Sequence, residues 1–161
     1  MAGFYYLIVS HKFVTGIKKM SDHPFEIERL FDAPVSKIWD ALTQNEQLKK
    51  WYFQIADFKP VVGFEFQFTG KTEDNNEYLH LCKITEVVPG KKLVYSWRYD
   101  SLPGNSFVSF ELFEEGEKTR IKLTHAGLES FASGGRDFVK ENFAQGWAYI
   151  LDKSLKVYLK A

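Results

Sequence analysis

The chain carries four histidines, one cysteine and several serines whose side chains can take part in catalysis or metal binding. His11 and His23 lie near the N-terminal end, whereas His80 and His125 fall within segments of alternating polarity. A histidine titrates near neutral pH, so either of the latter two is a candidate general base. Because buried polar groups are normally hydrogen-bonded within the protein, we expect both to be satisfied core or strand-end histidines instead.

The spacing of these residues gives little support to metal binding or nucleophilic catalysis. The set of ligands that could converge is His80, Cys82 and His125, and it lacks the local regularity of known zinc motifs. No glycine-flanked turn presents Ser96 or Ser109 as a nucleophile. We therefore predict no metal, no cofactor and no defined catalytic residue.

Arg29 is the one charged residue on a strand face that is otherwise apolar. It alternates with Ile27 and Phe31, so its guanidinium is expected to be partly buried. A partly buried guanidinium needs an anion or a carbonyl as a partner. The sequence leaves open whether that partner is a neighbouring strand, a ligand or solvent at the sheet edge.

Composition limits the classes of partner. The 161 residues contain 21 Lys plus Arg and 21 Asp plus Glu, without a Lys/Arg-rich run, so neither nucleic acid nor an anionic membrane is an expected partner. Aromatic residues make up 17% of the chain, and such rings either fill a core or line an apolar pocket. The single cysteine excludes an intrachain disulfide, suits a cytoplasmic protein, and is expected to be a small buried hydrophobe.

The N-terminal segment differs from the rest of the chain. Residues 4–9 are apolar but too few for a membrane span or an ordinary signal core, and no basic residue precedes them. Met20-Ser21-Asp22 resembles a second start of the chain. We predict that residues 1–19 are a leader or a disordered extension and that residues 20–161 form a single domain. The alternative is an extra strand at a sheet edge.

Hydrophobic periodicity predicts one strand, two helices, an antiparallel meander and a long last helix, an α+β arrangement. Pro34 suits the first turn of the first helix, and Asn45 and Asp137 are expected to cap the other two. The expected strands cover residues 25–31, 63–68, 78–87, 93–99, 107–113 and 120–125. The last helix is expected over 138–159, with this buried stripe: Val139, Phe143, Trp147, Ile150, Leu151, Ser154 and Tyr158.

Six ordered motifs between residues 24 and 159 resemble the activator-of-heat-shock-ATPase homolog family of the START-like (SRPBCC) superfamily. They are Asp32-Ala-Pro-Val-x-x-Ile-Trp39-x-Ala-Leu-Thr43, Leu48-x-x-Trp51, Val62-Gly63 with Phe66 and Phe68, Val87-x-Pro-x-x-x-Leu-x-Tyr-x-Trp97, Thr119-Arg-Ile-x-Leu-Thr-His125 and Gly146-Trp147-x-x-x-Leu-Asp152. The resemblance implies a helix-grip fold, in which a curved antiparallel sheet wraps the C-terminal helix and leaves a cavity. Relatives in the superfamily hold lipids, hormones or polyketides, and some are cyclases or dehydratases.

Together these observations predict a protein that binds a small hydrophobic or amphipathic ligand between the sheet and the last helix. The same rings could instead form a filled core. One alternative function is a module that docks on a chaperone through the outer sheet face, as the family name implies. Another is an enzyme of the polyketide cyclase or hydrolase type, with His80 or His125 as the base. The predicted ligand-binding residues are Phe66, His80, Tyr95, Trp97, Phe110, His125, Phe143 and Trp147.

Overall fold

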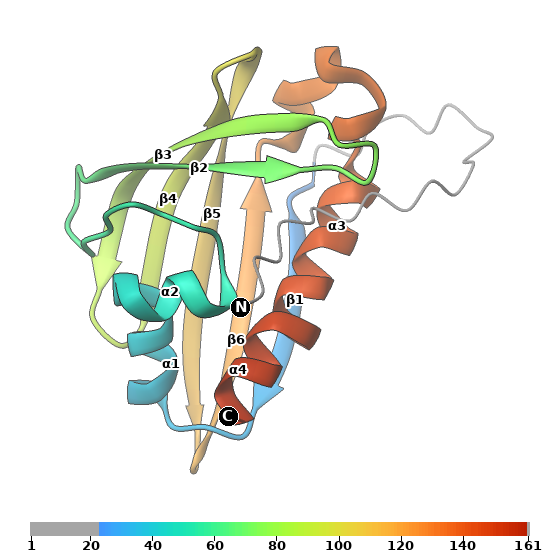
Figure 1. Ribbon diagram of the computed structural model, residues 1–161. Helices are drawn as coiled ribbons and strands as arrows, with labels where there is room; N and C mark the ends of the chain where they lie inside the picture. The colour runs from blue at the N-terminus through green and yellow to red at the C-terminus, as the bar shows by residue number, and fades with distance from the viewer. Residues whose placement is uncertain (1–22, 161) are drawn as a thin grey trace.

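A curved antiparallel sheet wraps a C-terminal helix in the computed structural model, which describes residues 23–160 (Figure 1). The six strands lie in the order β1-β6-β5-β4-β3-β2, so the first two strands of the chain occupy opposite edges. The strands are β1 (Phe25–Phe31), β2 (Glu65–Lys71), β3 (Glu77–Val88), β4 (Lys92–Tyr99), β5 (Leu102–Glu115) and β6 (Lys118–Ala126). The predicted α+β helix-grip architecture is confirmed, whereas the predicted leader at 1–19 lies outside the described residues.

The alternation of apolar residues along each strand builds the core. On β4 the side chains of Leu93, Tyr95, Trp97 and Tyr99 are all buried, and the inward positions of β5 and β6 behave in the same way. This follows from the two-residue period of a strand, which sends alternate side chains to one face. Several strand boundaries differ from the prediction, among them the starts of β2 and β5. The left-handed backbone of Gly63 delays β2 to residue 65, and β5 begins at residue 102, before Pro103-Gly104.

Two short helices carry the chain from β1 to the far edge of the sheet. α1 (Val35–Thr43) follows Pro34, as predicted, and α2 (Asn45–Trp51) follows after one residue. The prediction that Asn45 caps α2 is wrong, because Gln44 occupies the cap position and the Asn45 amide instead donates to the Ala56 carbonyl (3.2 Å). Residues 52–64 then cross beneath the concave face of the sheet without a helix or strand.

The C-terminal helix runs along the concave side of the sheet (Figure 1). It comprises α3 (Lys140–Tyr149), a π-helical stretch η2 (Ile150–Leu155) and α4 (Lys156–Lys160). The wider π-helical turns change the phase of the buried face, so Leu155 is buried where the periodicity predicted Ser154. Two other predicted members of the buried stripe, Val139 and Tyr158, are only half-buried.

The expected cap at Asp137 is also wrong. The helix starts after Val139, and a 3₁₀ segment, η1 (Leu128–Phe138), precedes it. Asp137 instead accepts hydrogen bonds from the Tyr78 hydroxyl (2.5 Å) and the Asn76 amide (3.2 Å). It therefore fastens this segment to the β2–β3 hairpin.

Polar contacts connect the C-terminal helix to β1 and to α2. Arg29 on β1 forms a two-pronged ion pair with Asp152, with Nε–Oδ1 at 2.7 Å and Nη2–Oδ2 at 3.2 Å. This answers the question that the sequence left open about the partner of Arg29. At the opposite side, the Tyr158 hydroxyl donates to Gln47 on α2 (2.8 Å). The sheet and α2 are thus held on either side of the helix.

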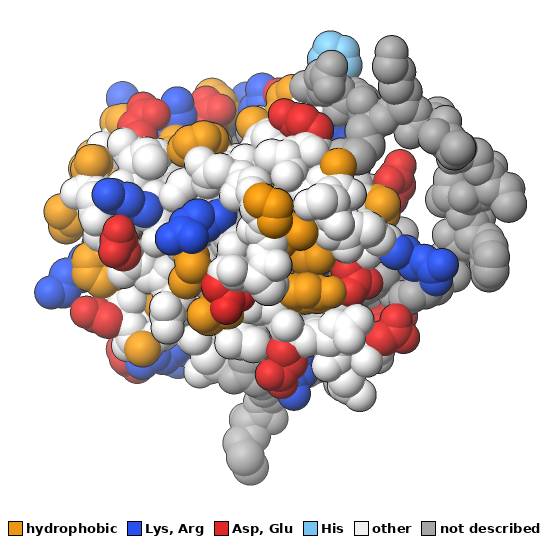
Figure 2. All heavy atoms as spheres, turned by 90° about the horizontal axis from the view of Figure 1, so that it is seen from above, with side chains coloured by type: hydrophobic (Ala, Val, Ile, Leu, Met, Phe, Trp, Pro, Cys, Tyr) orange, Lys and Arg blue, Asp and Glu red, His pale blue; other side chains and the backbone are white. Residues whose placement is uncertain are grey.

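The surface carries both signs of charge. Lys and Arg side chains lie interspersed with Asp and Glu side chains on the face seen in Figure 2, as expected for a chain with formal net charge zero. Within residues 23–160, no helix combines the length and the apolar character that crossing a membrane requires.

Candidate functional site

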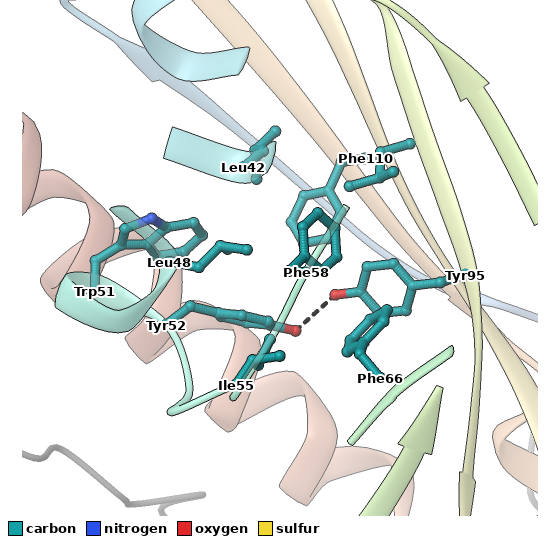
Figure 3. Close-up of a pocket in the computed structure, with 10 residues that line it drawn as sticks. Leu42, Leu48, Trp51, Tyr52, Ile55, Phe58, Phe66, Tyr95 and Phe110 are labelled. Carbon is teal, nitrogen blue, oxygen red and sulfur yellow. Dashed lines mark hydrogen bonds between the residues drawn. The ribbon is translucent and has the colours of Figure 1, made fainter. Parts of the chain in front are cut away.

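A small cavity lies where α1, α2 and the segment at 52–64 meet the inner face of the sheet (Figure 3). Its volume of about 10 Å³ corresponds to roughly one water molecule. The polar side-chain groups of the lining are the Trp51 indole N–H and the hydroxyls of Tyr52 and Tyr95. The Trp51 N–H donates to the Ala41 carbonyl (2.8 Å). The cavity is lined by Leu42, Leu48, Trp51, Tyr52, Ile55, Phe58, Phe66, Leu93, Tyr95 and Phe110.

The hydroxyls of Tyr52 and Tyr95 meet at this cavity, with their oxygens 2.7 Å apart. One hydroxyl donates to the other, so the proton of the accepting hydroxyl has no acceptor among the described residues. Burial raises the pKa of both tyrosines well above the usual value, which keeps the pair neutral. The apolar cavity therefore contains one unused hydrogen-bond donor.

A second polar group, His125, is fully buried and lies outside the cavity lining. Its Nδ1 accepts from the Trp147 indole N–H (3.0 Å), which places the ring proton on Nε2. Nε2 then donates to the Ser106 hydroxyl (2.8 Å), and that hydroxyl donates to the Trp97 carbonyl (2.8 Å). Burial lowers the pKa of His125 to about 3. With both nitrogens engaged, His125 has no free lone pair, which argues against a role as general base.

His80 differs from His125 because one of its nitrogens is unpartnered. Nδ1 lies 2.9 Å from the Tyr78 carbonyl, whereas Nε2 is buried without a hydrogen-bond partner. The ring stacks on Phe68 at 4.5 Å and lies over Gly70, where an added Cβ would come within 2.8 Å of Cε1. Gly70 thus makes room for the histidine. Burial lowers the pKa of His80 to about 3, partly offset by the carbonyls of Tyr78 and Phe68.

The structure brings all of the predicted ligand-binding residues into one continuous network of ring contacts. Phe66 contacts Tyr95 (5.1 Å between centroids), Tyr95 contacts Phe110 (6.2 Å), and Phe110 contacts Trp147 (6.0 Å). Trp97 joins His80 (4.8 Å) and His125 (5.3 Å) to this chain of rings, and His125 joins Phe143 (5.3 Å). Phe66, Tyr95 and Phe110 line the cavity, whereas the other five are buried outside its lining.

Sequence reasoning missed the residues that close the cavity from the other side. Tyr52, Ile55 and Phe58 line the cavity, and they are buried although they lie in a segment without regular secondary structure. Phe53, which contacts the Tyr52 ring, is buried in the same segment but does not line the cavity. The spacing of these residues follows neither a helical nor a strand period, so the run Trp51-Tyr52-Phe53 of adjacent rings was the available signal. Across residues 53–58, the described structure gives the backbone one hydrogen bond, to the Ala56 carbonyl. This segment is thus held mainly by its buried side chains.

The other candidates for chemistry are placed as follows. Cys82 is buried, as predicted, and burial raises the pKa of its thiol. Among residues 23–160, no group of three or more His, Cys, Asp or Glu side chains is arranged to hold a metal ion. His23 is exposed just before β1, and His11 lies outside the described residues.

Comparison with known proteins identifies the family. The model of the family described as "Activator of Hsp90 ATPase homolog 1-like protein" (AHSA1) matches residues 32–160. No curated protein matches the chain.

Solved structures share the fold over most of the chain. Protein MLL2253 from Mesorhizobium loti is 24% identical (TM-score 0.66), with 86% of this chain and 97% of that chain covered. Protein CV1439 from Chromobacterium violaceum is 19% identical (TM-score 0.72), with the same two coverages. CalU16 from Micromonospora echinospora is 26% identical (TM-score 0.61), with 83% and 72% covered. The family match spans well over half of the sequence, so the chain belongs to the AHSA1 family and has the helix-grip fold of the START-like superfamily.

Proposed function

We propose that this protein binds a small hydrophobic or amphipathic molecule on the concave side of the sheet, at the cavity where Tyr52 and Tyr95 meet. The predicted location was the gap between the sheet and the C-terminal helix, whereas this cavity is lined by α1, α2, the segment at 52–64 and the sheet. The observation that carries the proposal is the unused hydroxyl proton of this pair, which faces an otherwise apolar lining. Binding pockets for small molecules have this composition: mostly apolar walls with a few polar groups that fix orientation. A ligand with an ether or carbonyl oxygen would accept the free proton.

Binding requires the cavity to widen, because about 10 Å³ accommodates little more than one water. The element best suited to move is the segment at residues 53–58. Its backbone makes one hydrogen bond, whereas the strands on the other side are paired along most of their length by backbone hydrogen bonds. Moving it outward withdraws Phe53, Ile55 and Phe58 from the core. A ligand of similar apolar area would replace the contacts that these side chains lose.

The protein is proposed to bind its ligand without catalysing a reaction. The lone pair of His125 Nδ1 is occupied by Trp147, and burial makes His80 a weak base. A buried Cys82 is compatible with a reducing compartment, so we place the protein in the cytoplasm.

Titration with uncharged ring compounds and long-chain alcohols tests the proposal. We expect naphthalene to shift the NMR signals of Tyr52, Tyr95 and Phe110 in the wild type. Phe58→Ala enlarges the cavity and should tighten binding, whereas Phe113→Ala, at an exposed position on the outer face, should leave it unchanged. Absence of binding to the wild type across the whole panel would refute the proposal. Stimulation of a chaperone ATPase in that case would favour the docking alternative.

A further inference from the structure

His80 Nε2 is an unusual atom for a protein interior. It is one of two buried side-chain polar atoms in residues 23–160 that lack a hydrogen-bond partner, the other being Asn45 Oδ1. The histidine side chain is 1% exposed, so bulk water does not reach it. Buried polar groups without partners are rare in native proteins, and each one calls for an explanation. In this case the position of the ring suggests that the missing partner is a ligand.

The hydrogen bonds of the ring define what Nε2 can accept. Because the Tyr78 carbonyl is an acceptor, the ring nitrogen beside it, Nδ1, carries the proton. Nε2 consequently presents a lone pair and needs a donor. The rings around His80 are those of Phe53, Phe68, Trp97 and Tyr99, which offer no counter-charge. A matching donor is therefore an uncharged O–H or N–H group rather than an ammonium ion.

One neighbour of His80 can be replaced more easily than the others. Phe68, Trp97 and Tyr99 are on β2 and β4, whereas Phe53 belongs to the segment at 53–58, whose backbone makes one hydrogen bond. The Phe53 ring stacks on Phe68 at 4.1 Å with planes 15° apart, and it lies 6.0 Å from the His80 ring. A flat ring in the same place would keep this stacking. A donor group on such a ring would lie within reach of the histidine.

We propose that His80 Nε2 accepts a hydrogen bond from an uncharged hydroxyl or N–H group of a flat-ring ligand that takes the place of Phe53. Phe53 and His80 lie outside the lining of the cavity, but the inference rests on the proposed function because it requires the same segment, 53–58, to move. It narrows the ligand to uncharged aromatic or polycyclic molecules with a hydrogen-bond donor. His80 is then a specificity-determining residue. Anionic rings are excluded, because the buried surroundings of the site provide no cation to pair with them.

The test compares probes of similar shape that differ in their donor. 2-Naphthol carries a hydroxyl that can donate a hydrogen bond. Naphthalene, which is smaller, and 2-methoxynaphthalene, which is larger, have no such donor. 2-Naphthoate is negatively charged. For the wild-type full chain we expect 2-naphthol to bind about tenfold more tightly than naphthalene, which corresponds to ~1.4 kcal/mol. The ether oxygen of 2-methoxynaphthalene can accept the free tyrosine proton but cannot donate to His80, so this probe separates the two hydrogen bonds. The ¹⁵N signal of His80 Nε2 should shift with 2-naphthol alone. We expect no binding of 2-naphthoate.

Two variants assign the preference to His80. His80→Phe keeps an aromatic ring in the stack but removes the acceptor, so 2-naphthol should lose its preference over naphthalene. Phe53→Ala opens the place of the ligand and keeps His80, so all three uncharged probes should bind more tightly with the preference for 2-naphthol retained. If His80→Phe does not fold, Phe53→Ala still tests whether 2-naphthol is preferred.

The outcomes separate this inference from the proposed function. Equal binding of 2-naphthol and naphthalene to the wild type and to Phe53→Ala would overturn the role of His80, while ligand binding in the interior would stand. Binding of none of the uncharged probes to the wild type would contradict the proposed function itself. A Nε2 signal that already indicates a hydrogen bond in the free protein would show a trapped water as the partner, and this too would overturn the inference.

Discussion

Lowering the pH from 7 to 5 should destabilise this protein through its two buried histidines. His80 and His125 are 1% and 0% exposed, and burial lowers the pKa of each to about 3. In the unfolded chain a histidine titrates near pH 6.5. Between these values the unfolded state binds protons that the folded state does not. The stabilisation from the neutral rings is therefore present above pH 6.5 and is lost as the pH falls toward 3.

The size of the effect follows from the unfolded-state pKa, because the folded-state pKa lies well below pH 5. Each histidine should lower the free energy of unfolding by about 2 kcal/mol between pH 7 and pH 5, so the pair contributes ~4 kcal/mol. Unfolded carboxyl groups titrate mostly below this window, near pH 4, so the window reports mainly on histidine.

Urea unfolding at pH 7, 6 and 5, followed by tryptophan fluorescence, measures this quantity. The variant His80→Phe provides the comparison: it removes one of the two titrating rings and should lose about 2 kcal/mol less than the wild type over the same range. Wild type and variant curves that decline in parallel would refute the reasoning, because His80 would then not be a neutral buried group that resists protonation.

Three further perturbations test other parts of the structure. Ser106→Ala leaves the Nε2–H of His125 without an acceptor and should cost about 1–3 kcal/mol, measured by urea unfolding; a loss below about 0.5 kcal/mol would contradict the assigned direction of these hydrogen bonds. Phe53→Ala should cost about 3–5 kcal/mol, and saturating naphthalene should raise its melting temperature more than that of the wild type; equal shifts would argue against a cavity at this site. Asp152→Ala should cost less than about 1 kcal/mol, because both side chains of its ion pair with Arg29 are 41% exposed, and a larger loss would show that the pair does more than tether β1.

Much of the architecture could be predicted from local patterns. The two-residue alternation of apolar side chains located all six strands, and Pro34 located the start of α1. The errors fell at helix ends. Asn45 and Asp137 are good capping residues by type, yet both side chains bond to other parts of the chain, to Ala56 and to Tyr78 respectively. A capping preference of about 1 kcal/mol is small enough for such contacts to override it.

The sequence by itself determined which strand side chains face the interior, because the alternation of apolar residues along a strand is a property of consecutive residues. The same holds for the part of the stripe on the last helix from Phe143 to Leu151. On that basis the sequence identified the aromatic residues that meet between sheet and helix. Only the tertiary structure decided which of those rings line a cavity, which nitrogen of each histidine is partnered, and that the segment at 52–64 closes the interior. Those features depend on contacts between residues far apart in the chain, such as Tyr52 with Tyr95 and His125 with Trp147, and no local periodicity encodes them.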